Sequence, residues 1–251
     1  MKIIHMSELI DAIVDADEAK ALHLIPSSDI GYIDDDGNTA LLASCIFNLP
    51  NIAMALITTG KSKPEHANND GVTALIWACS YKMTNVAIAL IATGQSKPEC
   101  IDNEGYTALT LACSHKMTHV ALALIATGQS KPDHVNDDET ALMLACSHNM
   151  TDVAMALIAT GQSKPGRINK YGNTALKRAC HNKMTDVAMA IIATGQSKPE
   201  HNNWALPYAK RYNMTEVINA LENYDNYIAS LQQPIYTNPY DDPNYVMTIY
   251  I

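Results

Sequence analysis

The feature that most constrains this chain is a sequence motif that returns five times at an almost constant spacing. The tripeptide Thr-Ala-Leu recurs at intervals of 33 or 34 residues, beginning at Thr39, Thr73, Thr107, Thr140 and Thr174. Most copies extend it to G-x-T-A-L-x-x-A-C, followed after a short gap by M-T-x-V-A-x-A-L-I-A-T-G-Q-S-K-P. A fixed period of this length predicts stacked supersecondary units, each of which buries its apolar side only against its neighbours.

Each copy has the pattern of a helix, a turn, a second helix and a long loop. In the second copy, apolar residues at helical spacing predict a first helix over 74–81. We expect Thr84 to cap the second helix, because its hydroxyl can accept a hydrogen bond from an unpaired backbone N–H. Gly94 then ends that helix, and Pro98 prevents it from restarting.

The motif resembles the ankyrin repeat family. The resemblance lies in the G-x-T-x-L-x-x-A opening, the V-x-x-L-I core of the second helix, its terminal Gly and the repeat period, and it covers 7–223. The usual Thr-Pro-Leu-His opening differs here, with Ala in place of Pro at Ala40, Ala74, Ala108, Ala141 and Ala175. The resemblance implies an all-α solenoid of helix-turn-helix units with hairpin-like loops. The divergent form is similar to the arrays that giant DNA viruses of protists encode, with intracellular bacteria as an alternative source.

The two ends depart from the repeat and predict a domain organisation. We expect an N-terminal capping repeat over 1–36, five full repeats over 37–202, a C-terminal capping repeat over 203–223 and a separate tail over 224–251. The tail holds six of the twelve tyrosines and three prolines, so we do not expect it to continue the helix pairs. It either folds back on the stack, stays disordered or serves as a docking segment.

Charge and composition exclude several classes of function. The formal net charge is −9, and most of it lies at the two ends, with −7 over 1–36 and −3 over 224–251. The repeats between them therefore carry +1. They offer no broad basic face for binding nucleic acid. No apolar run reaches the ~18 residues of a membrane span, and no signal peptide is evident, which favours an intracellular, cytoplasmic protein. No nucleophile–base pair or phosphate-binding loop appears, so we expect no enzyme activity, no cofactor and no small-molecule substrate.

Cysteine and histidine also recur with the period. Five cysteines occupy one position of the first helix, where we expect small buried side chains too far apart for disulfides: Cys45, Cys79, Cys113, Cys146 and Cys180. Cys100 falls in a loop and is expected to be a free thiol. His66, His134 and His201 share a loop position, but loops one repeat apart are too distant to ligate one zinc ion. We therefore predict no metal site.

Positions that vary between copies indicate where a partner binds. In ankyrin repeats partners usually bind the concave face, which loop tips and first helices form, and stacking leaves only exposed positions free to vary. Aromatic side chains there are the best candidates for anchors, because they bring large contact area. The predicted contact residues are Phe47, Val72, Tyr81, Tyr106, His115, Glu139, His148, Tyr171 and His181.

The sequence thus favours a non-enzymatic scaffold that binds a partner protein, in the host cell if the protein is viral. One alternative is a docking protein phosphorylated on its tail, since the residues around Tyr236 resemble the Glu-Pro-Ile-Tyr-Ala motifs of bacterial effectors. Another is a substrate adaptor of a ubiquitin ligase, for which the tail looks too short and too rich in proline.

Overall fold

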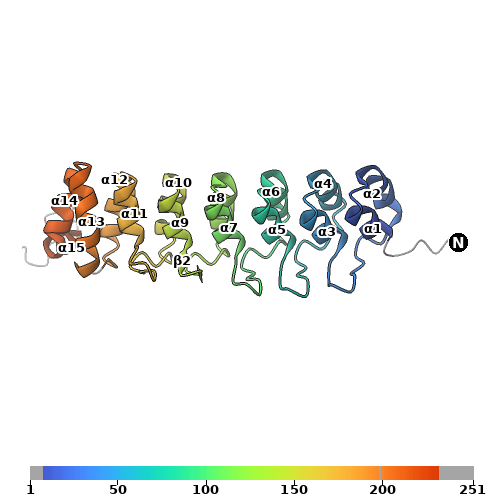
Figure 1. Cartoon of the computed structure of the whole chain (residues 1–251), viewed down its shortest axis with the longest axis horizontal. Helices are drawn as coiled ribbons and strands as arrows, with labels where there is room; N and C mark the ends of the chain where they lie inside the picture. The colour runs from blue at the N-terminus through green and yellow to red at the C-terminus, as the bar shows by residue number, and fades with distance from the viewer. Residues whose placement is uncertain (1–7, 198, 232–251) are drawn as a thin grey trace, which may run out of the picture.

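The computed structural model describes residues 8–197 and 199–231, in which pairs of helices stand side by side in one row (Figure 1). The first helices of the pairs are α1 (Glu8–Val14), α3 (Ala40–Ile46), α5 (Ala74–Ser80), α7 (Ala108–Ser114), α9 (Ala141–Ser147), α11 (Ala175–His181) and α13 (Pro199–Arg211). The second helices are α2 (Glu18–Leu24), α4 (Pro50–Thr58), α6 (Thr84–Ala92), α8 (Thr118–Ala126), α10 (Thr151–Ala159), α12 (Thr185–Ala193) and α14 (Thr215–Glu222). A short 3₁₀ turn, η1 (Ile25–Ser27), follows α2. The predicted all-α solenoid is confirmed.

The threonine of the Thr-Ala-Leu motif starts each first helix. Thr73 precedes α5, and its Oγ1 accepts a hydrogen bond from the backbone N–H of Ile76 at 3.3 Å. The same bond recurs in the other four copies of the motif. Each motif threonine thus satisfies one of the backbone donors that a helix N-terminus leaves unpaired.

The prediction that Thr84 caps the second helix is wrong. Thr84 is the first residue inside α6, and the N-cap is Met83, whose side chain makes no capping hydrogen bond. Lys82 reverses the chain between the helices with a φ of 59°, and this tight turn directs Met83 into the core, where it is 6% exposed. Apolar burial therefore takes the place of a side-chain cap at this turn.

The interior consists of small and medium-sized side chains that repeat from unit to unit. In the second repeat Leu75, Ala78, Cys79, Val86 and Leu90 are fully buried, and their equivalents in the other repeats form one continuous core. The five periodic cysteines are free thiols inside this core, and burial raises the pKa of Cys113 to about 12. These thiols therefore stay protonated and pack as small apolar groups.

The loops between pairs project to one side of the row and are hairpin-like (Figure 1). In the second repeat Ala67 and Thr73 form an antiparallel bridge, and Gly71 turns the chain with a φ of 75°. The fourth repeat is one residue shorter and lacks this glycine. Asp137 and Asp138 take positive φ there, a two-residue turn that pairs β1 (Val135–Asn136) with β2 (Glu139–Thr140).

The C-terminal end differs from the expectation in two ways. Helix α13 begins at Pro199, four residues before the expected cap boundary at 203. Residues 224–231 do continue the helical structure, as α15 (Tyr224–Leu231), which packs against α14 through partly buried Tyr224 and Tyr227. The first proline of the tail is Pro234, so no proline prevents helix formation before it.

Tyr236 and its motif lie outside the described residues. Within the described ranges, no helix is long and apolar enough to cross a membrane.

Candidate partner-binding site

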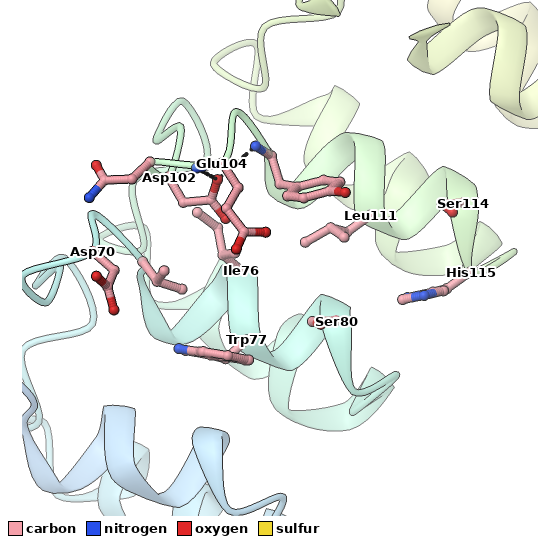
Figure 2. Close-up of a pocket in the computed structure, with 12 residues that line it drawn as sticks. Asp70, Ile76, Trp77, Ser80, Asp102, Glu104, Leu111, Ser114 and His115 are labelled. Carbon is pink, nitrogen blue, oxygen red and sulfur yellow. Dashed lines mark hydrogen bonds between the residues drawn. The ribbon is translucent and has the colours of Figure 1, made fainter. Parts of the chain in front are cut away.

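The first helices and the loops that precede them form one side of the molecule, named here the inner surface. It corresponds to the face that the ankyrin resemblance assigns to partners. A groove of about 620 Å³ opens on it between the second and third repeats. Side chains of α5, α7 and the two loops that precede them line this α5/α7 groove (Figure 2).

One wall of the α5/α7 groove is aromatic. Trp77 and Tyr81 lie one helical turn apart, so their side chains share a face. Their rings stack with centroids 5.5 Å apart and planes within 14°. Trp77 is half-buried, whereas Tyr81 is 44% exposed and continues the apolar wall onto the open surface. Leu111 of α7 lies opposite.

A tight loop positions Tyr106 in the lining of the groove. The Asp102 carboxylate accepts hydrogen bonds from the backbone N–H groups of Glu104 at 3.0 Å and Tyr106 at 2.7 Å. The Tyr106 hydroxyl then donates to Asp137 in the next loop, at 3.1 Å. This hydrogen bond and the nearby negative charge raise the pKa of Tyr106, so its hydroxyl keeps the proton that it donates.

His115 joins two repeats and also lines the groove. Its Nδ1 lies 3.0 Å from the backbone oxygen of Cys79, in the preceding repeat. A carbonyl only accepts, so Nδ1 carries the proton, and in the neutral ring Nε2 is left as an acceptor. Asn182 makes the equivalent contact to Cys146 at 2.7 Å. The sequence analysis missed this role, although the recurrence of His or Asn at the position is its signal.

The charged groups at the groove are acidic. The carboxylates of Asp70 and Glu104 make no hydrogen bond or ion pair with any other described residue, and Figure 2 shows both on the loop side of the groove. No lysine or arginine is among the described residues that line it. The groove therefore presents two uncompensated negative charges beside an aromatic wall.

The other predicted contact residues lie elsewhere on or near the inner surface. Phe47 is 43% exposed and Tyr171 is 71% exposed, and neither lines the α5/α7 groove. His181 is exposed, with its ring edge-on to Tyr208 at 5.2 Å between centroids. Partial burial, together with the positive charge of Lys116, lowers the pKa of His148. The structure therefore brings Val72, Tyr106 and His115 together in the groove, places Tyr81 beside it against Trp77, and leaves these four separate.

The structure corrects the expectation for two predicted contact residues. Val72 does line the α5/α7 groove, but it is only 8% exposed and packs against the core, so it offers little surface to a partner. The Glu139 carboxylate already has hydrogen-bond partners within the chain. It accepts hydrogen bonds from both Nη groups of Arg178 and from the side-chain amide of Asn169. Val72 therefore offers little contact area, and the Glu139 carboxylate is held within the chain by its own hydrogen bonds.

A second, smaller hollow lies near the C-terminal end of the same surface. This α11/α13 groove measures about 270 Å³ and is basic, with Lys177, Arg178 and His181 in its lining. Arg178 also donates to the backbone oxygen of Met143 at 3.1 Å, so its guanidinium holds two repeats together. Of the lysine and arginine in this lining, Lys177 has no ion-pair partner in the described structure.

The loop histidines have a structural role. Nε2 of His66 lies 2.8 Å from the backbone oxygen of Gly37, and Nε2 of His134 lies 2.7 Å from that of Gly105, each in the preceding loop. The described residues contain no group of His, Cys, Asp or Glu side chains with metal-binding geometry.

Comparison with known proteins agrees with this architecture. A family model described as "Ankyrin repeats (3 copies)" matches in overlapping positions, at residues 9–99, 63–136, 89–167 and 118–203. No curated protein matches the chain.

Solved structures provide further matches. A chain in the structure of a predatory endopeptidase from Bdellovibrio bacteriovorus in complex with an immunity protein is 27% identical, with a TM-score of 0.55 over 73% of this chain and 96% of that one. An ankyrin repeat domain from Acinetobacter baumannii is 23% identical, with a TM-score of 0.60 over 76% and 99% of the respective chains. The ankyrin repeat domain of Bcl-3 is 20% identical, with a TM-score of 0.58 over 84% and 97%. With its repeats matched from residue 9 to residue 203, this chain belongs to the ankyrin repeat family.

Proposed function

We propose that this chain is a non-enzymatic scaffold that binds a partner protein through its inner surface, centred on the α5/α7 groove. Ankyrin repeat domains generally mediate protein–protein interactions, and the buried positions of this chain are almost uniform from repeat to repeat. What distinguishes one repeat from another is therefore its exposed side chains, and these determine which partner is bound.

The observation that carries the proposal is the exposed aromatic pair beside a groove. Trp77 and Tyr81 present stacked rings at the surface, and Tyr106 adds a third ring held by its own loop. Aromatic side chains in a partly enclosed site are the usual energetic centres of protein interfaces. Because hydrogen bonds and stacking already hold these rings, little side-chain entropy is lost when a partner binds.

The similar chain from Bdellovibrio bacteriovorus supports the proposal, because it was solved in a complex between two proteins. The proposal extends to a cytoplasmic location and, for a virus-encoded array, to a host protein as the partner. The host partner rests on the sequence resemblance to viral arrays.

Site-specific photocrosslinking in cells that express the chain tests the proposal. A photoreactive phenylalanine analogue replaces Tyr81 on the inner surface or, as a matched control, Ile88 on α6, which is similarly exposed. We expect discrete covalent adducts with other proteins from position 81 and none of the same mass from position 88. Adducts from position 88 without any from position 81 would contradict the assignment of the inner surface.

A further inference from the structure

We infer that the α5/α7 groove binds a lysine or arginine side chain from an extended segment of the partner protein. This inference rests on the proposed function and specifies the chemistry of its partner. Three independent features of the groove lead to it: the hydrogen-bonding capacity of its walls, its charge and its aromatic surface.

The first feature is that two polar side chains of the groove, His115 and Tyr106, present hydrogen-bond acceptors to it. Among the described lining side chains, the buried donor without a partner is the Trp77 indole N–H. His115 uses Nδ1 as a donor to Cys79 and presents Nε2 as an acceptor in the neutral ring. Tyr106 uses its only hydroxyl proton on Asp137, which leaves lone pairs on its oxygen. A lysine ammonium or an arginine guanidinium supplies several donors and no acceptor, and so complements this lining.

The second feature is charge. Asp70 and Glu104 have no counter-ion in the described structure, and the neighbouring loops add Asp35, Asp36 and Asp137. The turns over 68–72 and 102–106, which approach the groove, hold no lysine or arginine, whereas Lys63 and Lys97 stand earlier in the same loops. An acidic segment would be repelled by Asp70 and Glu104. A purely apolar segment would remove water from two carboxylates without compensation.

The third feature is the aromatic wall, which also distinguishes the groove from a simple acidic patch. Cations bind favourably over the faces of tryptophan and tyrosine rings, and the aliphatic stem of lysine or arginine packs on apolar surface. Trp77 and Leu111 supply that surface on opposite sides of the groove, with the carboxylates at one end of it. A stem bound along the wall thus brings its charged head toward Asp70 and Glu104.

Binding of synthetic peptide pools to the full chain tests the inference. The pools are degenerate except at one central position, which is Lys, Arg, Gln, Leu or Glu. We expect the full chain to retain the Lys and Arg pools about tenfold better than the Glu pool at low salt, with the preference falling as salt rises. The Asp70→Asn/Glu104→Gln variant should lose most of this preference. The Lys177→Ala variant, altered in the other groove, should keep it.

Each other result has a distinct meaning. Equal retention of the Gln, Leu or Glu pools, or an unchanged preference in the Asp70→Asn/Glu104→Gln variant, overturns the inference. If peptides bind but Tyr81→Ala has no effect on any pool, the inner surface is not the site and the proposed function fails as well. If no pool is retained, the inference is overturned, whereas the proposed function is still decided by photocrosslinking. Thermal melting of each variant confirms that it is folded.

Discussion

The α5/α7 and α11/α13 grooves occupy equivalent places in the stack but use their polar side chains differently. At the α5/α7 groove, Asp70 and Glu104 have no ion-pair partner among the described residues. At the α11/α13 groove, Arg178 is bound by Glu139 of the preceding repeat. The first groove keeps its charge available to another molecule, and the second uses its arginine to join repeats.

Equivalent positions show the same division. Trp77, Leu111, Leu144 and Arg178 occupy one position of successive first helices. At Trp77 this position supplies an open aromatic wall, and at Arg178 it supplies an inter-repeat ion pair. One position of a repeat can therefore serve recognition in one unit and cohesion in another, provided that the core positions stay the same.

The largest expected effect concerns cohesion at the C-terminal groove. The Glu139 and Arg178 side chains are only 19% and 17% exposed, so Arg178→Met leaves a largely buried carboxylate without its cation. We expect the free energy of unfolding to fall by about 3 kcal/mol, as measured by urea denaturation. Adding Glu139→Gln should restore much of the loss, because the unpaired charge is then absent.

A matched control is Arg167→Met, which breaks the more exposed pair with Asp138. We expect a clearly smaller loss for this variant, because solvent screens the more exposed pair. Equal losses at Arg167 and Arg178 would show that burial does not distinguish the two pairs and would undo the comparison between the grooves.

A smaller effect is expected at the turn between the two helices of each unit. Lys82 and Lys183 both take a left-handed backbone, with φ of 59° and 58°, which is unfavourable for any residue with a Cβ. We expect Lys82→Gly to raise the free energy of unfolding by about 1 kcal/mol. Lys183 also lies over the Tyr212 ring, at 4.8 Å, a contact worth about 0.5–1 kcal/mol. Lys183→Gly should therefore gain little or nothing, and a gain equal to that of Lys82→Gly would argue against the cation–π contact.

The smallest expected effect is a pH dependence of folding stability, which arises from His148 in the repeat between the two grooves. Burial and then the charge of Lys116 lower the pKa of His148 below its ordinary value of 6.5. The unfolded chain then binds a proton more readily than the folded one, so stability falls as pH drops through 6.5. Urea midpoints at neutral and mildly acidic pH should show a smaller loss for His148→Gln than for the unaltered chain. An identical loss in both proteins would exclude His148 as a source of this dependence.

The units and their helices could be predicted from the repeat period, because helix formation in each unit depends on residues close together in the sequence. The spacing of Thr73 and Thr107 indicates the period, and apolar residues at helical spacing indicate which faces are buried. Capping was harder to predict, because Thr73 and Thr84 both stand at the start of a helical segment, Thr73 as its N-cap and Thr84 as its first helical residue. The choice between them depends on burial of Met83, which is a tertiary contact.

The candidate site could be predicted only in part. Tyr81, Tyr106 and His115 were identified as exposed, variable positions, and the structure places them at or beside one groove. Val72 also lies in that groove, but the sequence did not predict that it is almost fully buried, because its burial depends on the neighbouring repeat. Glu139 was misjudged because its ion-pair partner, Arg178, is 39 residues away in the sequence.

The sequence by itself determined that this protein is a stack of ankyrin repeats, because periodic apolar side chains can be buried only by stacking similar units. It did not determine which of its polar side chains remain available to another molecule. Only the tertiary structure decided that, because hydrogen bonds and ion pairs between neighbouring repeats occupy Glu139 and Arg178 and leave Asp70 and Glu104 unpaired.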